Sequence, residues 1–268
     1  MTFQPVVPFG GNAGWAFLQR TREAQQTAFE ASPAIQRDTD YFRETIGSIT
    51  TAEQLVDDRR LLRVALGAFG LDEDINNTFF IRKALEESTL EPGSLANRLS
   101  DKRYLAMAET FGFGDVVPPN TALSDFPDRI IEQFESRQFE VAVGNQNPDV
   151  RLALSLSSEL QALADRGLSD DAAWFTVMAT PPLRTVFERA FSLPIAVGTL
   201  DIDRQLEIFR EKASAFFGDT TVAQFVDPER QEELNRLFLA RSELETTPQA
   251  TVRGSAALAI LQSATPLF

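Results

Sequence analysis

The sequence contains neither cysteine nor histidine among its 268 residues. The lack of cysteine excludes disulfides, thiol catalysis and thiolate metal sites. The lack of histidine removes the commonest general base, the commonest zinc ligand and the usual partner of a nucleophilic serine. We therefore predict that the protein is not an enzyme, with no catalytic, cofactor-binding or metal-binding residues and no cofactor. The 39 acidic residues leave a carboxylate-based enzyme as an alternative, although no pair of acids is singled out for that chemistry.

The chain also has little of the positive charge and none of the long apolar runs that nucleic acids and membranes require. Its net charge is −14, without a basic patch in the sequence order, so it should bind neither nucleic acid nor an anionic membrane surface. No run approaches the ~20 apolar residues of a membrane helix, so we expect no membrane insertion. The first basic residue is Arg20, so the charged start of a secretory signal is missing. We expect a cytoplasmic protein, or one exported without a cleavable signal peptide, that binds a protein partner. The sequence sets no oligomeric state.

Strand patterns are nearly absent, whereas apolar residues recur at helical spacing along most of the chain, so the predicted fold class is all-α. Phenylalanine supplies 22 of the 26 aromatic residues and should fill most of the aromatic core. The clearest helix signal lies between Leu55 and Asp74. There a short helix end, an acidic break, an apolar helix and a glycine stop follow one another. Side chains on the apolar stripe of this helix and of a related one should be buried: Leu61, Leu62, Leu66, Phe69, Leu183, Phe187 and Phe191.

The ends of the central helix carry recognisable signals. Asp57 and Asp58 suit the positive N-terminal end of the helix dipole. Gly70 suits the left-handed residue of a Schellman stop, in which Leu71 folds back onto Leu66. On either side, Thr50 with Glu53 fits a capping box for the preceding short helix, and Asp72 should cap the next helix with Phe79 on its inner side.

Parts of this stretch recur in altered form three more times. The second copy spans residues 94–115, the third begins at Thr180 and the fourth at Asp227. The first two copies start 43 residues apart, from Asp58 to Asp101, and the last two 47 apart, from Thr180 to Asp227. The spacing predicts a multi-helix protein built from degenerate helix-turn-helix repeats in two related halves. Independent convergence on common helix signals is the alternative.

Four regions follow from this pattern. Residues 1–14, rich in proline and glycine, should form a flexible lead-in. The N-terminal helical half would span 15–120 and the C-terminal half 121–245. Residues 246–268 would form a C-terminal tail with a short helix. Both ends carry apolar residues without periodicity, which either dock on the helical body or await a partner's surface.

Three acidic groupings are the candidates for metal or acid–base chemistry. Asp72-x-Asp74-x-Asn76 begins like a calcium loop, but glycine and glutamate are missing from the positions where an EF-hand needs them. Asp170-Asp171 and Asp201-x-Asp203 are acid pairs without partner ligands, and capping and solvated turns explain them better.

Two further motifs also favour structural roles. The glycine-rich segment 10–14 has neither the preceding strand nor the following basic residue of a phosphate loop. Arg59-Arg60 and Lys102-Arg103 recur at matched positions. They could form a basic strip that faces a partner, but we favour a role as counter-charges to the aspartates at the helix starts.

Longer segments resemble a widespread alphaproteobacterial family known only as domain of unknown function 1217. The likeness covers most of residues 12–245. The segments that carry it are Tyr41-Phe42, LVDDRRLLRVALGAFGLDEDI (55–75), SLANRLSDKRY (94–104), FEVAVGNQNPDVRLAL (139–154), AAWFTVMATPPLRTVFERAF (172–191) and LDIDRQLEIF (200–209). Members are often encoded among flagellar genes, which implies a structural, assembly or regulatory role near the flagellum and names no active site.

Together these observations favour a non-enzymatic structural or assembly protein of the bacterial flagellar system that acts through protein–protein contacts. A cytoplasmic chaperone or regulator of flagellar subunits is the first alternative. A structural part would be exported to the flagellum, whereas a chaperone would remain in the cytoplasm.

Overall fold

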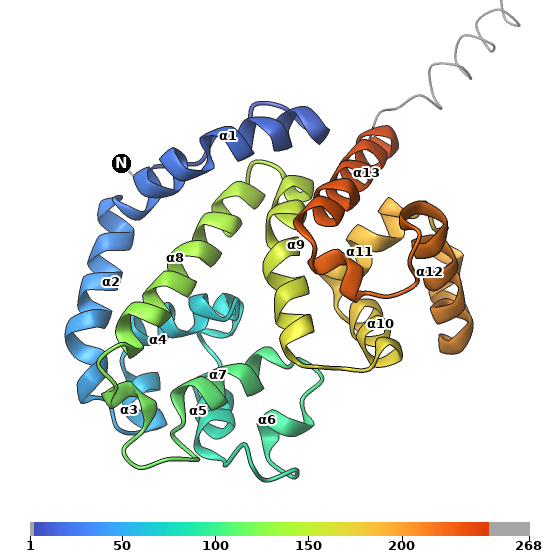
Figure 1. Ribbon diagram of the computed structural model, residues 1–268. Helices are drawn as coiled ribbons and strands as arrows, with labels where there is room; N and C mark the ends of the chain where they lie inside the picture. Colours follow the sequence, from blue (N-terminus) through green and yellow to red (C-terminus); the bar gives the residue numbers. More distant parts are fainter. Residues whose placement is uncertain (1–2, 247–268) are drawn as a thin grey trace, which may run out of the picture. The chain divides into compact units, whose positions relative to one another are not determined.

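The computed structural model describes residues 3–246, and every regular element within this range is a helix (Figure 1). The predicted all-α fold class is confirmed. The expected tail lies outside the described residues from position 247 onward. The α-helices are α1 (Gly11–Glu30), α2 (Pro33–Thr45), α3 (Ala52–Asp57), α4 (Arg59–Ala68), α5 (Thr78–Glu86), α6 (Leu95–Arg98), α7 (Arg103–Phe111), α8 (Phe126–Gly144), α9 (Pro148–Asp165), α10 (Asp170–Ala179), α11 (Pro181–Ala190), α12 (Ile202–Phe217) and α13 (Pro228–Thr246). Short 3₁₀ segments are η1 (Ile46–Ser48), η2 (Asp72–Asp74), η3 (Asn120–Ala122), η4 (Ile195–Thr199) and η5 (Ala223–Val226).

The chain forms two compact units. The first contains the described part of Met1–Val6 together with Arg20–Gln146, and the second contains Val7–Gln19 and the described residues from Asn147 onward. Helix α8 packs against α2 and α4 and so belongs to the first unit, although it lies beyond residue 120. The boundary between the compact units therefore lies between Gln146 and Asn147, not between residues 120 and 121, where the predicted halves meet. That the two halves are related stays a prediction.

Helix α4 is the centre of the first unit, where it packs between α2 and α8. Asp58 caps it by accepting hydrogen bonds from the backbone N–H groups of Arg60 and Leu61 at 2.9 and 3.1 Å. At the other end Leu71 N–H donates to the Leu66 carbonyl at 2.9 Å, and Gly70 adopts a left-handed φ of 68°. Asp58 lies at the predicted helix start and in addition caps it, and the predicted Schellman stop is confirmed.

Glycine in the middle of α4 has a packing cause. A Cβ atom at Gly67 would lie 2.7 Å from Cδ2 and 2.8 Å from Cε2 of the Phe134 ring on α8. Phe134 is buried. The missing side chain therefore lets α4 and α8 approach closely, which outweighs the intrinsic helix cost of glycine.

Some local predictions in the first unit are wrong. The capping box is made by Thr51 and Gln54, one residue after the expected pair. The next helix, α5, begins at Thr78 rather than at Asp72, because 72–74 form a 3₁₀ turn first. This shift turns Phe79 outward, where it is 72% exposed, while Ile81, Ala84 and Leu85 face the core. Phe69, expected to be buried, is only half-buried.

Aromatic rings fill the core of the second unit. Trp174 lies 5.5 Å from Phe187 and 5.8 Å from Phe209, both in edge-on contacts, and Phe225 packs on Phe187 and Phe217 at 5.0 and 4.9 Å. The expected burial of Leu183, Phe187 and Phe191 on α11 is confirmed, as is that of Leu61, Leu62 and Leu66 on α4. On α13, Leu234 and Phe238 are buried, whereas Leu244 is exposed.

The N-terminal lead-in is more ordered than its composition predicts. Helix α1 begins at Gly11 rather than near Trp15, and Gly14 N–H donates to the Gly10 carbonyl at 3.1 Å. Trp15 is buried in the second unit, and its indole N–H donates to Glu232 at 3.0 Å. In the first unit the backbone of Val6 is bonded through both its N–H and its carbonyl to the Gln25 side chain. Residues 11–14 therefore belong to α1, and the Val6 backbone is held by Gln25, whereas the side chains of Val6 and Phe9 are exposed. Flexibility of the segment 1–14 stays a prediction.

Candidate functional site

The second unit exposes a group of large apolar residues around η4. Ile195 is 95% exposed, Leu200 42% and Ile202 46%, and Pro194 beside them is also exposed. We refer to Pro194, Ile195, Leu200 and Ile202 as the η4 surface. Val197 is the only residue of η4 that faces the core. Four apolar side chains within nine residues therefore face outward, on a segment with one buried anchor.

The η4 surface begins at a tight turn that closes α11. Ser192 adopts a left-handed φ of 52°, and Leu193 N–H donates to the Glu188 carbonyl at 2.8 Å. This is the same Schellman geometry that closes α4. The turn leads the chain from α11 into η4. Its hydrogen bond fixes the backbone directly before the exposed residues.

A partly buried polar network fixes the other side of the surface. The Gln205 side chain, on α12, is 5% exposed and donates to the Leu200 carbonyl at 2.8 Å. Its amide oxygen accepts from Arg184 Nη2 at 2.9 Å, and Arg184 Nε in turn donates to Glu188 at 2.7 Å. Arg184 also lies directly against η4, where a Cβ at Gly198 would be 3.2 Å from its Nη2. The backbone at the end of η4 is therefore held by Gln205, while Ile195 and Leu200 are exposed within the described part of the chain.

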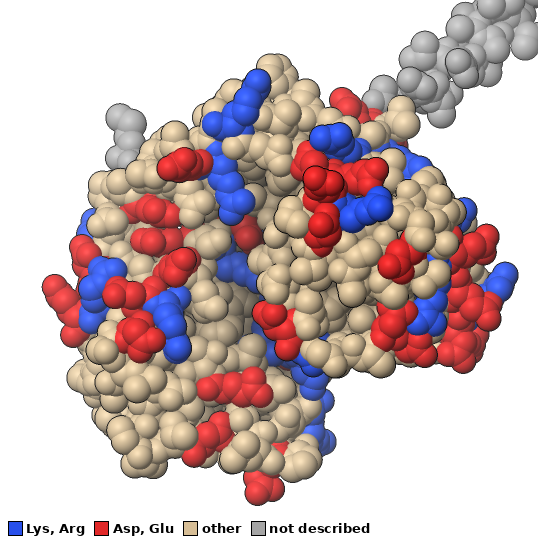
Figure 2. Space-filling model, in the orientation of Figure 1, with Lys and Arg blue, Asp and Glu red and all other residues tan. Residues whose placement is uncertain are grey.

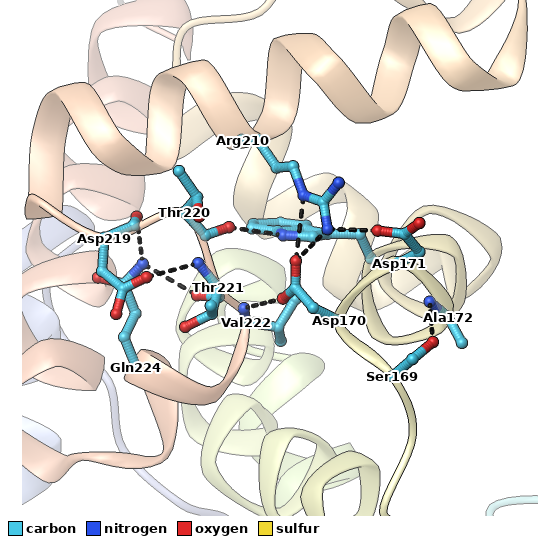
Figure 3. Close-up of polar contacts among 11 residues, drawn as sticks. Ser169, Asp170, Asp171, Ala172, Arg210, Asp219, Thr220, Thr221, Val222 and Gln224 are labelled. Carbon is cyan, nitrogen blue, oxygen red and sulfur yellow. Dashed lines mark hydrogen bonds and ion pairs between the residues drawn. The ribbon is translucent and has the colours of Figure 1, made fainter.

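A second polar cluster holds the middle of α12 against the start of α10 (Figure 3). Arg210 on α12 donates to both Asp170 and Asp171 in the first turn of α10, and its Nε lies 3.1 Å from Asp170 Oδ2. Asp170 also accepts from Val222 N–H at 3.2 Å, and the Trp174 indole donates to the Thr220 carbonyl at 2.9 Å. The hydrogen bond to Asp170 raises the pKa of Arg210 further above its usual value. The cluster ties together α10, α12 and the loop that follows α12.

The acidic groupings noted in the sequence have structural partners. Asp170 and Asp171 are not an isolated pair, because Arg210, some forty residues later in the chain, binds both. Asp201 caps α12 by accepting from Asp203 N–H at 3.0 Å. In the first unit Asp72 accepts from Gln138, and Asp74 accepts from the Tyr104 hydroxyl at 2.5 Å. Within residues 3–246 no three acidic side chains are grouped as a metal ion would require.

The basic pairs have different partners. Arg60 lies over the Tyr41 ring, 3.9 Å from its centroid, and within 3.9 Å of Asp38. Arg103 pairs with Asp101 and donates to the Gly70 carbonyl. Arg103 therefore pairs directly with the aspartate at its helix start. Arg60 makes its ion pair with Asp38 on α2. Burial raises the pKa of Asp58, but the Tyr41 hydrogen bond, the backbone N–H groups and the charge of Arg60 together lower it.

One carboxylate has a strongly shifted pKa. Burial and the neighbouring Glu30 raise the pKa of Glu135, on α8, to about 7. A shallow groove of about 560 Å³ runs beside α8 and is lined by Glu109, Thr110, Asn120, Arg129, Ile130, Glu132 and Gln133. Glu135 is not among the lining residues. The groove is therefore not lined by the carboxylate whose pKa is raised.

Sequence patterns do not predict the η4 surface. Its residues, SLPIAVGTLDI (192–202), contain many apolar side chains without helical or strand periodicity. Such a run is compatible with a buried loop as well as with an exposed one. The one signal that could have indicated this surface is a helix stop followed by a proline and by an apolar run with neither helical nor strand periodicity.

The chain has detectable relatives. The model of the family described as protein of unknown function (DUF1217) matches residues 68–230. A crystal structure of a protein from Agrobacterium tumefaciens has the same fold, with a TM-score of 0.72 and 23% sequence identity, over 91% of this chain and all of that one. Among curated proteins, no match to the sequence is found. No helix within the described range combines the length and apolar character needed to cross a membrane.

Proposed function

Because the chain belongs to the DUF1217 family, we propose that it is a non-enzymatic structural or assembly protein of the bacterial flagellar system that acts through protein–protein contacts. The observation that carries the contact function is the η4 surface, where apolar side chains are exposed on a backbone held by partly buried hydrogen bonds. Exposed apolar groups on a fixed scaffold are typical of interaction sites. The flagellar assignment rests on the resemblance of the sequence segments.

The charge distribution agrees with a protein partner. On the face drawn in Figure 2, Lys and Arg side chains lie among Asp and Glu rather than gathering in one basic area. With a net charge of −14, such a surface disfavours nucleic acid. Arg184, which lies against η4, and Arg204, which follows Ile202 closely in the chain, are paired with acids of the same unit.

Fractionation of motile cells tests this function. A tagged chain that captures a flagellar component and co-purifies with the basal body or filament fraction is the expected result. Capture of a flagellar subunit from the cytoplasm alone would favour the chaperone or regulator instead. Capture of no flagellar protein from motile cells, with a known flagellar component captured in parallel as the control, would refute the assignment.

The carboxylate-based enzyme is the weaker alternative. It rests on the pKa of about 7 for Glu135, which suits a general acid or base. Glu135 is not a lining residue of the groove, which argues against this alternative.

We further propose that the two units are related copies of one helical unit. Helices α2, α3, α4 and α8 of the first unit would correspond to α9, α10, α11 and α13 of the second. In each set the third helix packs against the other three. Both α4 and α11 end in a Schellman turn followed by a 3₁₀ segment, and both α7 and α12 end at a left-handed glycine, Gly112 and Gly218. Superposition of the two sets with the same order and handedness is the expected result, and opposite handedness would refute a duplication.

A further inference from the structure

We propose that the η4 surface binds a basic, apolar segment of a partner protein. The inference rests on the proposed function, since it presumes that the chain acts by protein contact, and it adds where the contact lies and what chemistry the partner brings. Pro194, Ile195, Leu200 and Ile202 supply the apolar part of the site. The charges around them specify the partner.

Two carboxylates without cationic partners border the apolar residues. Asp201 stands between Leu200 and Ile202 in the chain, and Asp203 follows; both are exposed, and neither has a Lys or Arg nitrogen within 4.0 Å among the described residues. The neighbouring Arg204 is paired with Glu207, so this pair adds no net charge. Arg184 beneath the surface is likewise paired with Glu188. The border of the η4 surface is therefore net negative.

This charge selects among the possible occupants. A second copy of the chain would bring another net charge of −14, and an anionic membrane would also be repelled. A protein segment that carries Lys or Arg beside apolar residues satisfies both parts of the site at once. An amphipathic helix with apolar residues three and four positions apart can place its cationic residues along the edge of the contact.

The support beneath the surface favours binding without rearrangement. The Leu200 carbonyl is fixed by Gln205, and Gln205 is fixed by Arg184. Ordering a loop on binding costs affinity, and a backbone that is already fixed avoids that cost. Four apolar side chains make a small contact, of the size typical of transient complexes.

Fluorescence anisotropy of a labelled amphipathic peptide tests the site in the full-length protein. The probe is a helical peptide of Leu and Lys, with a peptide of Leu and Glu at the same positions as its counterpart. The double variant I195S/I202S removes two exposed apolar side chains, and D203N removes one negative charge while Asp201 keeps its capping role. V117S is the matched control, because Val117 is 98% exposed and lies in the other unit.

We expect the Leu/Lys peptide to bind the wild type and V117S equally and to bind I195S/I202S at least about tenfold more weakly. D203N should bind more weakly and with a shallower dependence on salt. Circular dichroism and thermal midpoints equal to those of the wild type would establish that the variants fold. Equal affinity of I195S/I202S, or equal binding of the Leu/Glu peptide, would overturn the proposal. A dimer of the free protein that I195S/I202S dissociates would assign the surface to a second copy and overturn it as well.

The same variants separate this inference from the proposed function. If the wild-type chain captures no flagellar protein from motile cells, the proposed function fails. If the wild type and I195S/I202S capture the same partner in equal amounts, the function stands and the assignment of the η4 surface fails.

Discussion

Replacing Gly67 with alanine should destabilise the protein, although alanine is the better helix former. The new Cβ would lie 2.7 and 2.8 Å from two atoms of the Phe134 ring and 3.0 Å from Gln138 Nε2. All three distances are shorter than van der Waals contact. Phe134 is 2% exposed, so the ring cannot swing into solvent, and α4 and α8 would have to separate.

Two opposing terms set the size of the effect. Overpacking of a filled core costs roughly 1–3 kcal/mol, and contacts with two atoms of a buried ring place this site in the upper part of that range. The change from glycine to alanine in a helix returns about 1 kcal/mol. The net loss should be about 1–2 kcal/mol, which lowers the thermal midpoint by a few degrees.

Thermal and urea unfolding of Gly67→Ala measure this loss. Gly47→Ala is the matched control, because its Cβ would meet nothing nearer than the Thr121 carbonyl oxygen at 4.0 Å, and it should be neutral or slightly stabilising. Adding Phe134→Leu should reduce the penalty of Gly67→Ala, since the two side chains are in direct contact. A Gly67→Ala protein as stable as the wild type would show that the close approach of α4 and α8 is not why glycine stands there.

Three further substitutions test other parts of the structure. Leu66→Ala should cost about 2–5 kcal/mol, because Leu66 is fully buried in α4, and an unchanged urea midpoint would contradict this. Glu135 has a folded pKa of about 7 against 4.5 for an ordinary glutamate, so the stability it contributes is present below pH 4.5 and is lost as the pH rises through 7. Glu135→Gln should therefore raise the thermal midpoint above pH 7 and leave it little changed near pH 5; the same gain at both values would exclude titration of Glu135 as the cause. Ser192→Gly should stabilise the second unit by about 0.5–1 kcal/mol, because it removes the left-handed strain at φ 52°, and a lower midpoint would argue that the serine side chain has a role of its own.

The parts of the fold that local chemistry encodes were predictable from the sequence. Asp58 at the start of α4 and Gly70 at its end are signals that act within a few residues of themselves, and both lie where they were expected. The start of α5 has no such signal, since Asn77 makes no side-chain cap. A helix that began at Asp72 would have Phe79 on its inner face, whereas the helix that begins at Thr78 has Phe79 on its exposed face. Local patterns thus predict the bounds of a helix only where capping residues or a glycine stop lie at its ends.

The exposure of a side chain could not be predicted from local patterns, because it depends on which other helices pack against it. Arg210 and Asp170 are forty residues apart, and nothing in either neighbourhood points to the other. The apolar run around Ile195 has the composition of a core loop, but no helix covers it within the described part of the chain. Candidate contact sites of this kind emerge only once the packing of the helices is known.

The placement of the chromophores gives each unit its own optical reporter. Both tryptophans, Trp15 and Trp174, belong to the second unit, and both tyrosines, Tyr41 and Tyr104, belong to the first. Indole emission excited selectively therefore follows the environment of the second unit alone, while near-ultraviolet dichroism of the phenols follows the first. If the units melt independently, the two signals will give different midpoints in one sample, without any label. Coincident midpoints would mean that the units unfold as a single cooperative body.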